Sequence, residues 1–388
     1  MNKKGLNTYI DFGSSRIRIG VFDLESSKNI FTSEKDCISN FNEKYFDISK
    51  SNEVINSLIK VAEKKIDNHI KNINLMIDTP DMFSIDISIK RTFDKKKYSN
   101  SDILYLLQEG KNLIQNNYFD KKIVHMIAKK FIYDDIEYFE IPNKELNYNS
   151  IIVDLKFICF SKNIFKNLQD IFNINHLFIN NIYSSSYARS ANYNLNFENY
   201  KKKIFLDIGY NKSTVIVFED KRFLFFNVLP VGGNHITKDI SVLLKIDIND
   251  AEIMKKSLNK SDTVFENKLD ENIKLKSPDF YKQIIHARVD EIIKLNLANE
   301  YFNSFFYQND NSVLVFTGEG SKILNKNSIY LEEIFDFFNE ISFFEEDSTS
   351  ICESGFNFDN EKKFQEVSFQ TKKSKNKGFF EKFFNFFN

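Results

Sequence analysis

Tyr9-Ile10-Asp11-Phe12-Gly13-Ser14-Ser15-Arg16 runs directly into Ile17-Arg18-Ile19-Gly20-Val21-Phe22, which gives an apolar strand, Asp-x-Gly, a short polar turn and a second apolar strand. The same order returns at Ile204-Phe205-Leu206-Asp207-Ile208-Gly209, which leads through Lys212-Ser213-Thr214 into Val215-Ile216-Val217-Phe218. A single Asp-x-Gly is usually only a turn. A carboxylate that twice ends a buried strand suits a metal-bound phosphate, because Asp reaches Mg²⁺ and glycine admits backbone N–H groups. The pair predicts two related half-domains that clamp one nucleotide, with Asp11 and Asp207 as Mg²⁺ ligands.

The composition of the 388-residue chain excludes several classes of protein. The net charge of −1 gives no electrostatic reason to expect nucleic-acid binding. The three cysteines are odd in number and widely separated, which is typical of a reducing cytosol. Histidines and cysteines form no ligand-spaced cluster, so no structural metal is predicted. No signal peptide is recognised at the N-terminus, and no apolar run approaches the roughly 18 residues of a spanning helix.

Hydrophobic periodicity divides the chain into segments. Residues 1–80 and 163–202 predict the first half-domain, and residues 81–162 predict a compact α/β insert between them. The second half-domain is expected at 203–240 and 304–360, around a mostly helical segment at 241–303. Residues 361–377 are polar and lysine-rich and predict a linker, which precedes a phenylalanine-rich tail at 378–388.

A third glycine-containing loop follows another apolar strand. Thr317-Gly318-Glu319-Gly320-Ser321 comes after Val313-Leu314-Val315-Phe316 and before an expected helix. Small residues there let a flat ring approach the backbone, and a helix N-terminus favours anions. The order Asp-x-Gly, insert, Asp-x-Gly, helical segment, Thr-Gly-x-Gly is that of the actin, heat-shock chaperone and sugar-kinase ATPases.

The chain resembles one family within this superfamily, the actin-like bacterial division protein FtsA. The most specific match is Val228-Leu229-Pro230-Val231-Gly232-Gly233-Asn234-His235-Ile236-Thr237-Lys238-Asp239-Ile240. Asp250-Ala251-Glu252-Ile253-Met254-Lys255 resembles the family's Ala-Glu-x-x-Lys helix, and Arg288 with Glu291 resembles its Arg-x-x-Glu helix. An exposed helical ion pair is the competing interpretation of Arg288 and Glu291.

The resemblance implies an α/β, actin-like fold with two RNase H-like half-domains. These are subdomains 1A and 2A; the insert corresponds to the 1C (SHS2) subdomain of FtsA, and 241–303 corresponds to 2B. ATP and Mg²⁺ are the implied cofactors. The nucleotide-binding residues expected from the loops and the resemblance are Asp11, Gly13, Ser14, Ser15, Arg16, Asp207, Gly209, Tyr210, Asn211, Lys212, Gly232, Gly233, Arg288, Glu291, Gly318, Glu319, Gly320 and Ser321.

Departures from the FtsA pattern affect the expected chemistry. Tyr210, Asn211 and Lys212 replace Gly-Gly-Thr, and Thr214 stands where a second Asp is common. Lys212 either contacts phosphate or points to water. Glu319 replaces a glycine, and its carboxylate would repel a triphosphate by about 1 kcal/mol if it faced the site. We identify no catalytic base, so we expect ATP binding with at most weak ATPase activity.

The tail is expected to anchor the protein to a membrane. As a helix, it would gather its aromatic residues on one face beside a lysine cluster. Docking on the chain's own core is the alternative. The expected membrane-binding residues are Lys377, Phe379, Phe380, Phe383, Phe384 and Phe387.

The resemblance implies a protein that self-associates into filaments and tethers FtsZ filaments to a membrane. The expected location is the cytoplasmic face of the cell inner membrane at the division septum. Subdomain 2B would bind the C-terminal peptide of FtsZ. Other division proteins would bind through 1C. A PilM-like component of type IV pilus assembly is the first rival, since it shares the fold and a comparable insert but lacks an amphipathic anchor. The second rival is an enzyme of the superfamily, either a sugar kinase or a heat-shock-type ATPase. We identify neither a catalytic Asp nor a sugar pocket, and the insert lies in the wrong place for the heat-shock type.

Overall fold

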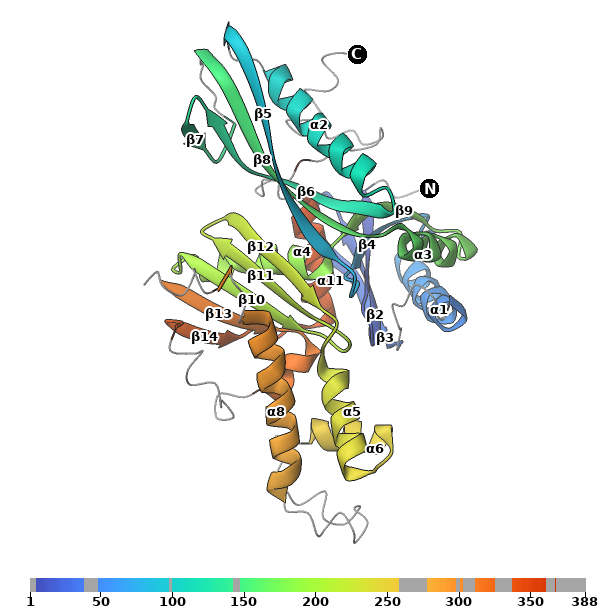
Figure 1. Cartoon of the computed structure of the whole chain (residues 1–388). Coiled ribbons are helices and arrows are strands. Elements are labelled where there is room, and N and C mark those ends of the chain that lie inside the picture. Colours follow the sequence, from blue (N-terminus) through green and yellow to red (C-terminus); the bar gives the residue numbers. More distant parts are fainter. Residues whose placement is uncertain are drawn as a thin grey trace. The chain divides into compact units, whose positions relative to one another are not determined.

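The structure, a computed structural model, describes residues 5–37, 48–97, 100–141, 147–257, 278–297, 301–302, 311–324, 337–360 and Val367 (Figure 1). The chain forms two compact units: residues 1–193, 221–224 and 348–388 make the first, and residues 194–220 and 225–347 make the second. The phenylalanine-rich tail with its six expected membrane-binding residues lies outside the described residues. No helix in the described part of the chain is both long and apolar enough to cross a membrane.

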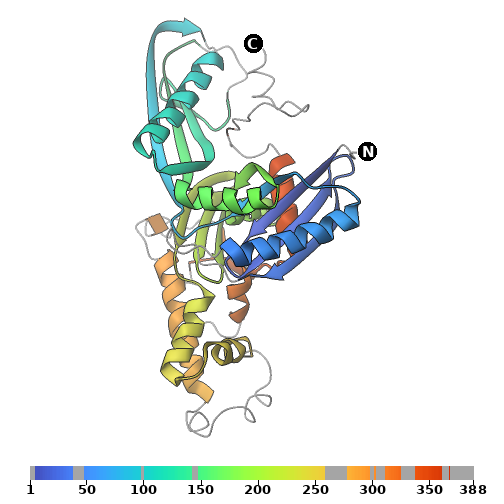
Figure 2. The ribbon, with the colours of Figure 1, turned by 90° about the vertical axis from the view of Figure 1, so that its right-hand side faces the viewer.

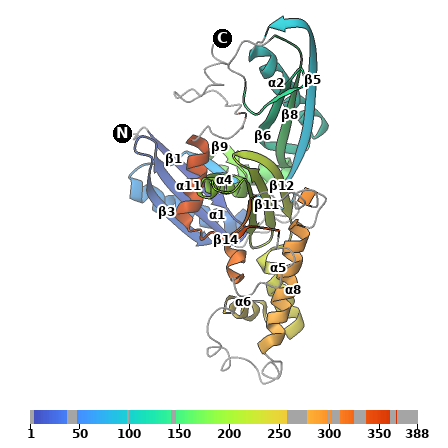
Figure 3. The same cartoon turned by 90° about the vertical axis from the view of Figure 1, so that its left-hand side faces the viewer.

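The first unit contains a five-stranded sheet in the order β3-β2-β1-β4-β9. β1 (Leu6–Phe12) pairs antiparallel with β2 (Arg16–Asp23), which pairs with β3 (Lys28–Asp36), and β1 pairs parallel with β4 (Asn72–Ile77). β9 (Phe178–Tyr183) completes the sheet. α1 (Ile48–Ile66) and α3 (Lys162–Ile174) cover one face (Figure 2). α4 (Ser185–Tyr193) and α11 (Ser348–Asn360) cover the other face (Figure 3).

The second unit repeats this connectivity. Its sheet has the order β12-β11-β10-β13-β14, with β10 (Lys202–Ile208) antiparallel to β11 (Ser213–Glu219) and parallel to β13 (Ser312–Thr317). β12 (Arg222–Leu229) and β14 (Glu340–Phe343) are the edges. The described helices α5 (Gly233–Leu244), α6 (Ile248–Lys256) and α8 (Pro278–Leu297) overlap or lie within the expected helical segment, of which residues 258–277 and 298–300 lie outside the described residues. The two matching sheets are the structural form of the sequence repeat.

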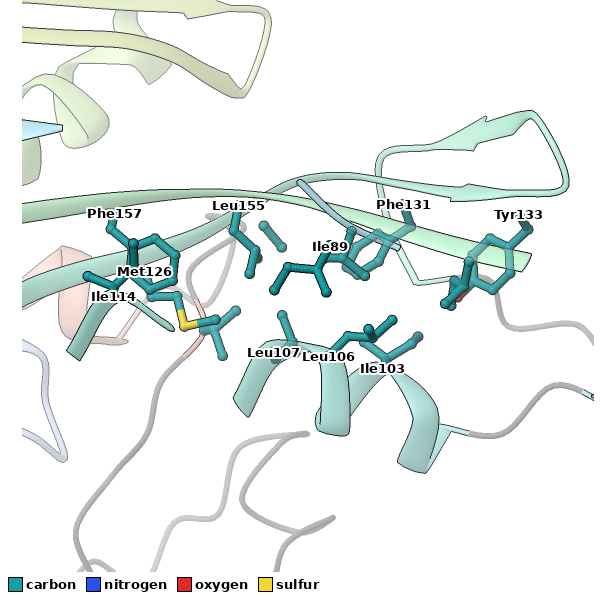
Figure 4. Packing of buried hydrophobic residues seen from close by; sticks show 14 of the residues in the cluster. Ile89, Ile103, Leu106, Leu107, Ile114, Met126, Phe131, Tyr133, Leu155 and Phe157 are labelled. Atoms are coloured by element: carbon teal, nitrogen blue, oxygen red, sulfur yellow. The ribbon is translucent and has the colours of Figure 1, made fainter. Parts of the chain in front are cut away.

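The insert has its own sheet and core. β5 (Phe83–Lys97), β8 (Asn147–Ser161), β6 (Lys121–Tyr133) and β7 (Ile136–Tyr138) lie side by side in that order, and the pairs are antiparallel. Figure 4 shows Leu106 and Leu107 of α2 (Asn100–Asn117) pointing toward Leu155 of the sheet. Each fully buried side chain of this size contributes about 1.5–3 kcal/mol. Val367, expected in the polar linker, is instead buried in this core, and its N–H donates to the Met126 carbonyl at 2.8 Å.

The domain boundaries differ from the expected ones at residues 194–202, 221–224 and 348–360. We expected residues 348–360 in the second half-domain, but α11 belongs to the first unit, and residues 194–202 belong to the second. Phe356 of α11 stacks on Phe22 with centroids 4.8 Å apart. Asp359 accepts hydrogen bonds from the hydroxyls of Tyr9 and Tyr183, at 2.8 and 2.9 Å. The apolar face of α11 and its terminal carboxylate therefore match the first sheet, which the local periodicity of the helix does not reveal.

Candidate functional site

Asp11 is the penultimate residue of β1 in the first unit and is almost completely buried. Its cross-strand neighbour is Arg18, whose Nη1 lies 2.9 Å from Asp11 Oδ2. The other carboxylate oxygen, Oδ1, accepts a hydrogen bond from the Ser185 hydroxyl at 2.6 Å. Both oxygens of this carboxylate are therefore bound by protein groups, which compensates for removing its charge from water.

The turn after Asp11 is closed by its own backbone. The Gly13 N–H donates to the Arg16 carbonyl at 3.0 Å, and a Cβ on Gly13 would lie 2.7 Å from that oxygen. Ser14 is buried, and the Ser15 carbonyl accepts from the Cys37 N–H at 2.9 Å. The Arg16 side chain pairs with Glu34 and Asp36 of β3, at 2.9 and 3.0 Å. The turn itself requires glycine at position 13, whatever the loop binds.

The second hairpin has the same construction in the second unit. Asp207 is buried at the end of β10, and the Gly209 N–H donates to the Lys212 carbonyl at 2.9 Å. Asp207 pairs across the hairpin with Thr214, at the position that Arg18 holds in the first hairpin. The Thr214 hydroxyl is buried and has no hydrogen-bond partner within the described residues. Lys212 is also buried, so the alternative in which it points to water is wrong.

Four glycines bring three loops of the second unit together. A Cβ on Gly232 would lie 2.6 Å from the Gly209 carbonyl, and a Cβ on Gly320 would lie 2.7 Å from the Ile208 carbonyl. The Gly233 N–H donates to the Gly209 carbonyl at 2.9 Å. Gly318 has a φ of +85°, and a Cβ there would lie 2.3 Å from the Asp207 carboxylate. The predicted residues of these loops therefore do converge, and backbone packing explains three of these glycines.

The remaining predicted residues of the second unit surround this convergence. The Asn211 side chain accepts from the Asn234 amide at 3.0 Å, which ties the second loop to α5. Burial and the charge of Glu252 raise the pKa of Tyr210. The Ser321 hydroxyl donates to the Gly318 carbonyl at 2.7 Å.

The carboxylate of Glu319 is paired. It lies 2.9 Å from the Lys322 ammonium, and both side chains are about half exposed. The Gly318 N–H, one residue earlier, donates to the Glu346 carboxylate at 2.8 Å. Lys322 therefore offsets the charge of Glu319, which reduces the repulsion expected from the sequence.

Lys255, which the sequence analysis quotes only as part of the Ala-Glu-x-x-Lys helix, also lies at this site. Its side chain is only 11% exposed. Its Nζ donates to the Gly233 carbonyl at 3.0 Å and to the Thr237 hydroxyl at 2.8 Å, and pairs with Glu252 at 2.6 Å. Burial lowers its pKa. The Lys255 ammonium thus lies beside Gly232 and Gly233 at the start of α5. In the sequence, only the Glu-x-x-Lys spacing pointed to Lys255.

Arg288 and Glu291 lie on α8. Arg288 makes a two-pronged contact with Asp239 of α5, with Nε–Oδ2 and Nη2–Oδ1 distances of 2.5 and 3.0 Å. Its Nη1 donates to Glu291 at 2.6 Å. These contacts raise the Arg288 pKa and join α5 to α8. The structure thus gives Arg288 a helix-joining role, and Glu291 is its partner on the same helix.

Asp207, Lys212 and Lys255 of the second unit are groups of the kind that would hold ATP with Mg²⁺, whereas both oxygens of Asp11 already have protein partners. Each unit ends a central strand with one buried carboxylate, Asp11 in the first and Asp207 in the second. Within the described ranges, no three His, Cys, Asp or Glu side chains gather as a metal cage. Nucleotide-bound Mg²⁺ typically needs only one or two carboxylates, since phosphates and waters complete its shell. Lys212 and Lys255 add cationic groups around the second loop.

Comparisons of the sequence with known proteins find one family. The family described as "Cell division protein FtsA" matches residues 204–342. The FtsA protein of Enterococcus faecalis is 24% identical over 259 residues, which cover 66% of this chain and 58% of that protein. The Bacillus subtilis FtsA protein is 30% identical over 185 residues, covering 45% of this chain and 42% of that protein. The chain thus matches about half the length of these relatives.

Solved structures share the fold at low identity. A "PilM-PilN type IV pilus biogenesis complex" chain has a TM-score of 0.61 and 11% identity, with 88% of each chain covered. MreB 5 of Spiroplasma citri bound to AMPPNP has a TM-score of 0.51 and 11% identity, covering 92% of this chain and 97% of that one. The expected actin-like α/β fold is confirmed. The chain is a protein of the actin-like ATPase fold, and its predicted resemblance to the FtsA cell-division proteins is confirmed.

Proposed function

We propose that this actin-like protein binds ATP with Mg²⁺, polymerises, and tethers FtsZ filaments to the cytoplasmic membrane during cell division. The duplicated hairpin, with one buried strand-end carboxylate in each unit, carries the nucleotide part of the proposal. Asp11 and Asp207 would hold the Mg²⁺, which would neutralise phosphate charge. Lys212 and Lys255 would contribute further positive charge near the second loop. The solved MreB 5 complex with AMPPNP supports nucleotide binding by this fold.

Thermal denaturation with ATP and Mg²⁺ tests nucleotide binding. A ligand that binds only the folded chain stabilises it by about 2.7 kcal/mol at 100 times its Kd, so millimolar ATP–Mg²⁺ should raise Tm. Asp207→Ala should abolish the rise, because it removes the strand-end carboxylate. Asp120→Ala, at an exposed turn of the insert, is the matched control and should keep the rise. A wild-type chain with no shift at millimolar ATP would instead be a nucleotide-free scaffold.

The FtsZ contact is proposed for the helices of the second unit. α5 and α6 expose large apolar side chains, among them Val242 (72% exposed) and Ile253 (58%). Lys256 on α6 is 73% exposed. An acidic-apolar peptide would find both features there. Because a disordered peptide must be ordered on binding, we expect an affinity of about micromolar.

Paired substitutions test this assignment. Val242→Asp with Ile253→Asp should abolish binding of a labelled peptide from the C-terminus of FtsZ, measured by fluorescence anisotropy. Phe119→Asp, at an insert side chain that is 74% exposed, is the matched control and should bind as wild type. If only Phe119→Asp weakened binding, the contact would lie on the insert, which would favour a PilM-like role.

Membrane anchoring rests on the tail sequence and is tested with vesicles. The chain should sediment with anionic liposomes, and changing Phe383 and Phe384 together to Asp should release it, because charges would replace the aromatic face. Deletion of 378–388 should have the same effect. Unchanged sedimentation of the double variant would contradict the anchor and favour the PilM-like alternative. Filament formation is tested by electron microscopy on lipid monolayers.

A further inference from the structure

The insert is joined to the first sheet at a buried imidazole. His125 lies on β6, directly before Met126, whose side chain packs in the insert core. Neighbouring residues of a strand point to opposite faces, so the His125 ring faces away from that core. A register shift between Ile123 and His125 marks a β-bulge, a feature that re-aims side chains. Only 1% of His125 is exposed.

Rings of the first unit hold the imidazole in place. The His125 ring centroid lies 4.9 Å from that of Tyr187, 5.6 Å from that of Phe358 and 6.1 Å from that of Tyr183. These aromatic residues come from α4, α11 and β9, and Figure 3 shows α4 and α11 together on the first sheet. The ring is therefore fixed by elements outside the insert that carries it.

The ring accepts one hydrogen bond that continues toward Asp11. The Ser184 N–H donates to His125 Nε2 at 2.8 Å, so this ring nitrogen acts as the acceptor. Ser184 precedes α4, and its hydroxyl accepts from the Tyr187 N–H at 3.3 Å as a helix cap does. The next residue, Ser185, donates its hydroxyl to Asp11 Oδ1 at 2.6 Å.

A second carboxylate fixes the same tripeptide. Asp78, which follows β4, accepts from the Ser184 hydroxyl at 2.6 Å and from the Ser186 N–H at 2.9 Å. All three serines and Asp78 are buried. A buried N–H or hydroxyl that loses its partner cannot turn to water, so a displaced Ser184 must move its neighbours with it.

We propose that His125 is a positioning residue through which the insert holds Asp11 and the turn that follows it, at residues 13–16, in place. Its Nε2 holds Ser184, which places the Ser185 hydroxyl on the Asp11 carboxylate. A partner that shifts β6 would thereby change nucleotide affinity, and nucleotide would change the affinity for that partner by the same factor. The inference rests on the proposed function in so far as Asp11 holds Mg²⁺.

Three variants of the full chain separate the hydrogen bond from general packing. His125→Phe keeps a ring in the aromatic cage and removes the acceptor. His125→Gln supplies an acceptor oxygen near the position of Nε2. Met126→Ala, at the next residue on the same strand, disturbs the insert core and leaves the link intact.

Two measurements are made on each variant: the Kd of a fluorescent ATP analogue with Mg²⁺, and hydrogen exchange of peptides covering 10–18 and 184–188. We expect His125→Phe to weaken binding about fivefold or more, a typical coupling between sites, and to speed exchange in both peptides. His125→Gln should recover both properties. Met126→Ala should lower Tm and leave both near wild type.

The proposal is overturned if His125→Phe binds as wild type with unchanged exchange at 10–18, or if Met126→Ala weakens binding as much as His125→Phe does. A wild-type chain that binds no nucleotide refutes the proposed function separately. Exchange at 10–18 then still decides whether His125 positions the loop.

Discussion

Replacing Arg18 with Met should destabilise the first unit strongly, because it leaves the buried Asp11 carboxylate without a counter-charge. The side chains of Arg18 and Asp11 are only 9% and 6% exposed, and their charged atoms are 2.9 Å apart. Removing one member of a buried ion pair typically costs about 3–5 kcal/mol, since the other charge stays out of water. Arg18 Nε also lies 3.3 Å from Glu34, without the alignment of a hydrogen bond, but that carboxylate is 36% exposed and adds little.

The loss in free energy of unfolding caused by Arg18→Met should be recovered when the charge of Asp11 is also removed. Asp11→Asn combined with Arg18→Met leaves two neutral groups of similar volume, and such replacements are often neutral. We expect the double variant to regain at least about 2 kcal/mol of the loss. Mg²⁺ with ATP should also recover part of it in Arg18→Met alone, because a cation would again stand beside Asp11.

Urea unfolding followed by circular dichroism measures these changes, with hydrogen exchange at 6–23 as the local readout. The chain has no tryptophan and two compact units, so a local measurement is needed beside the global one. Arg16→Met is the matched control on the same strand. Its partner Asp36 is 84% exposed, so it should cost about 1 kcal/mol or less. The reasoning fails if Arg18→Met costs no more than Arg16→Met, or if the double variant recovers nothing.

Gly318→Ala should lower the stability of the second unit by about 1–3 kcal/mol for its backbone conformation alone, and more from its contact with Asp207. Gly233→Ala, whose Cβ would have no neighbour closer than 3.6 Å, should be near neutral, and equal urea midpoints for the two would contradict the argument. His235 accepts a hydrogen bond from the Gly232 N–H, and burial lowers its pKa from 6.5. Its contribution to stability should therefore be full above about pH 6.5 and be lost as the pH falls toward the lower folded-state pKa. His235→Gln should flatten that part of the urea midpoint–pH curve, and an unchanged slope would refute the assignment.

The fold was predictable because its decisive signals are local. The same pattern, an apolar strand that ends in Asp-x-Gly, occurs in both units. The backbone hydrogen bond that closes each hairpin spans four consecutive residues, as between Gly209 and Lys212. The insert was also visible, since alternation such as that of residues 83–89 marks a half-buried strand. The position of α11 was missed because its partners, Tyr9 and Phe22, lie more than three hundred residues away.

Much of the candidate site depends on contacts between distant residues. Arg18 looks like an ordinary strand residue, and only the pairing register places it opposite Asp11. Ser185 meets Asp11 across 174 positions, and His125 meets Ser184 across 59. Lys255 carries a charge on a short helix, which suggests a surface role until the packing of α5 on α6 turns its ammonium toward Gly233.

The structure changes the interpretation of the glycines. From the sequence, Gly13, Gly209 and Gly320 suggested room for phosphate or a flat ring. In the structure, a Cβ on Gly13 or Gly320 would lie 2.7 Å from a carbonyl oxygen of the protein itself, and one on Gly209 would lie 3.1 Å from such an oxygen, so close packing already explains these glycines. They therefore give no independent support for a ligand. The stronger support comes from Asp11 and Asp207, because the two units repeat a buried carboxylate at equivalent positions of their central strands. The response of Asp207→Ala to ATP–Mg²⁺ is consequently a sharper test of nucleotide binding than any substitution at a glycine.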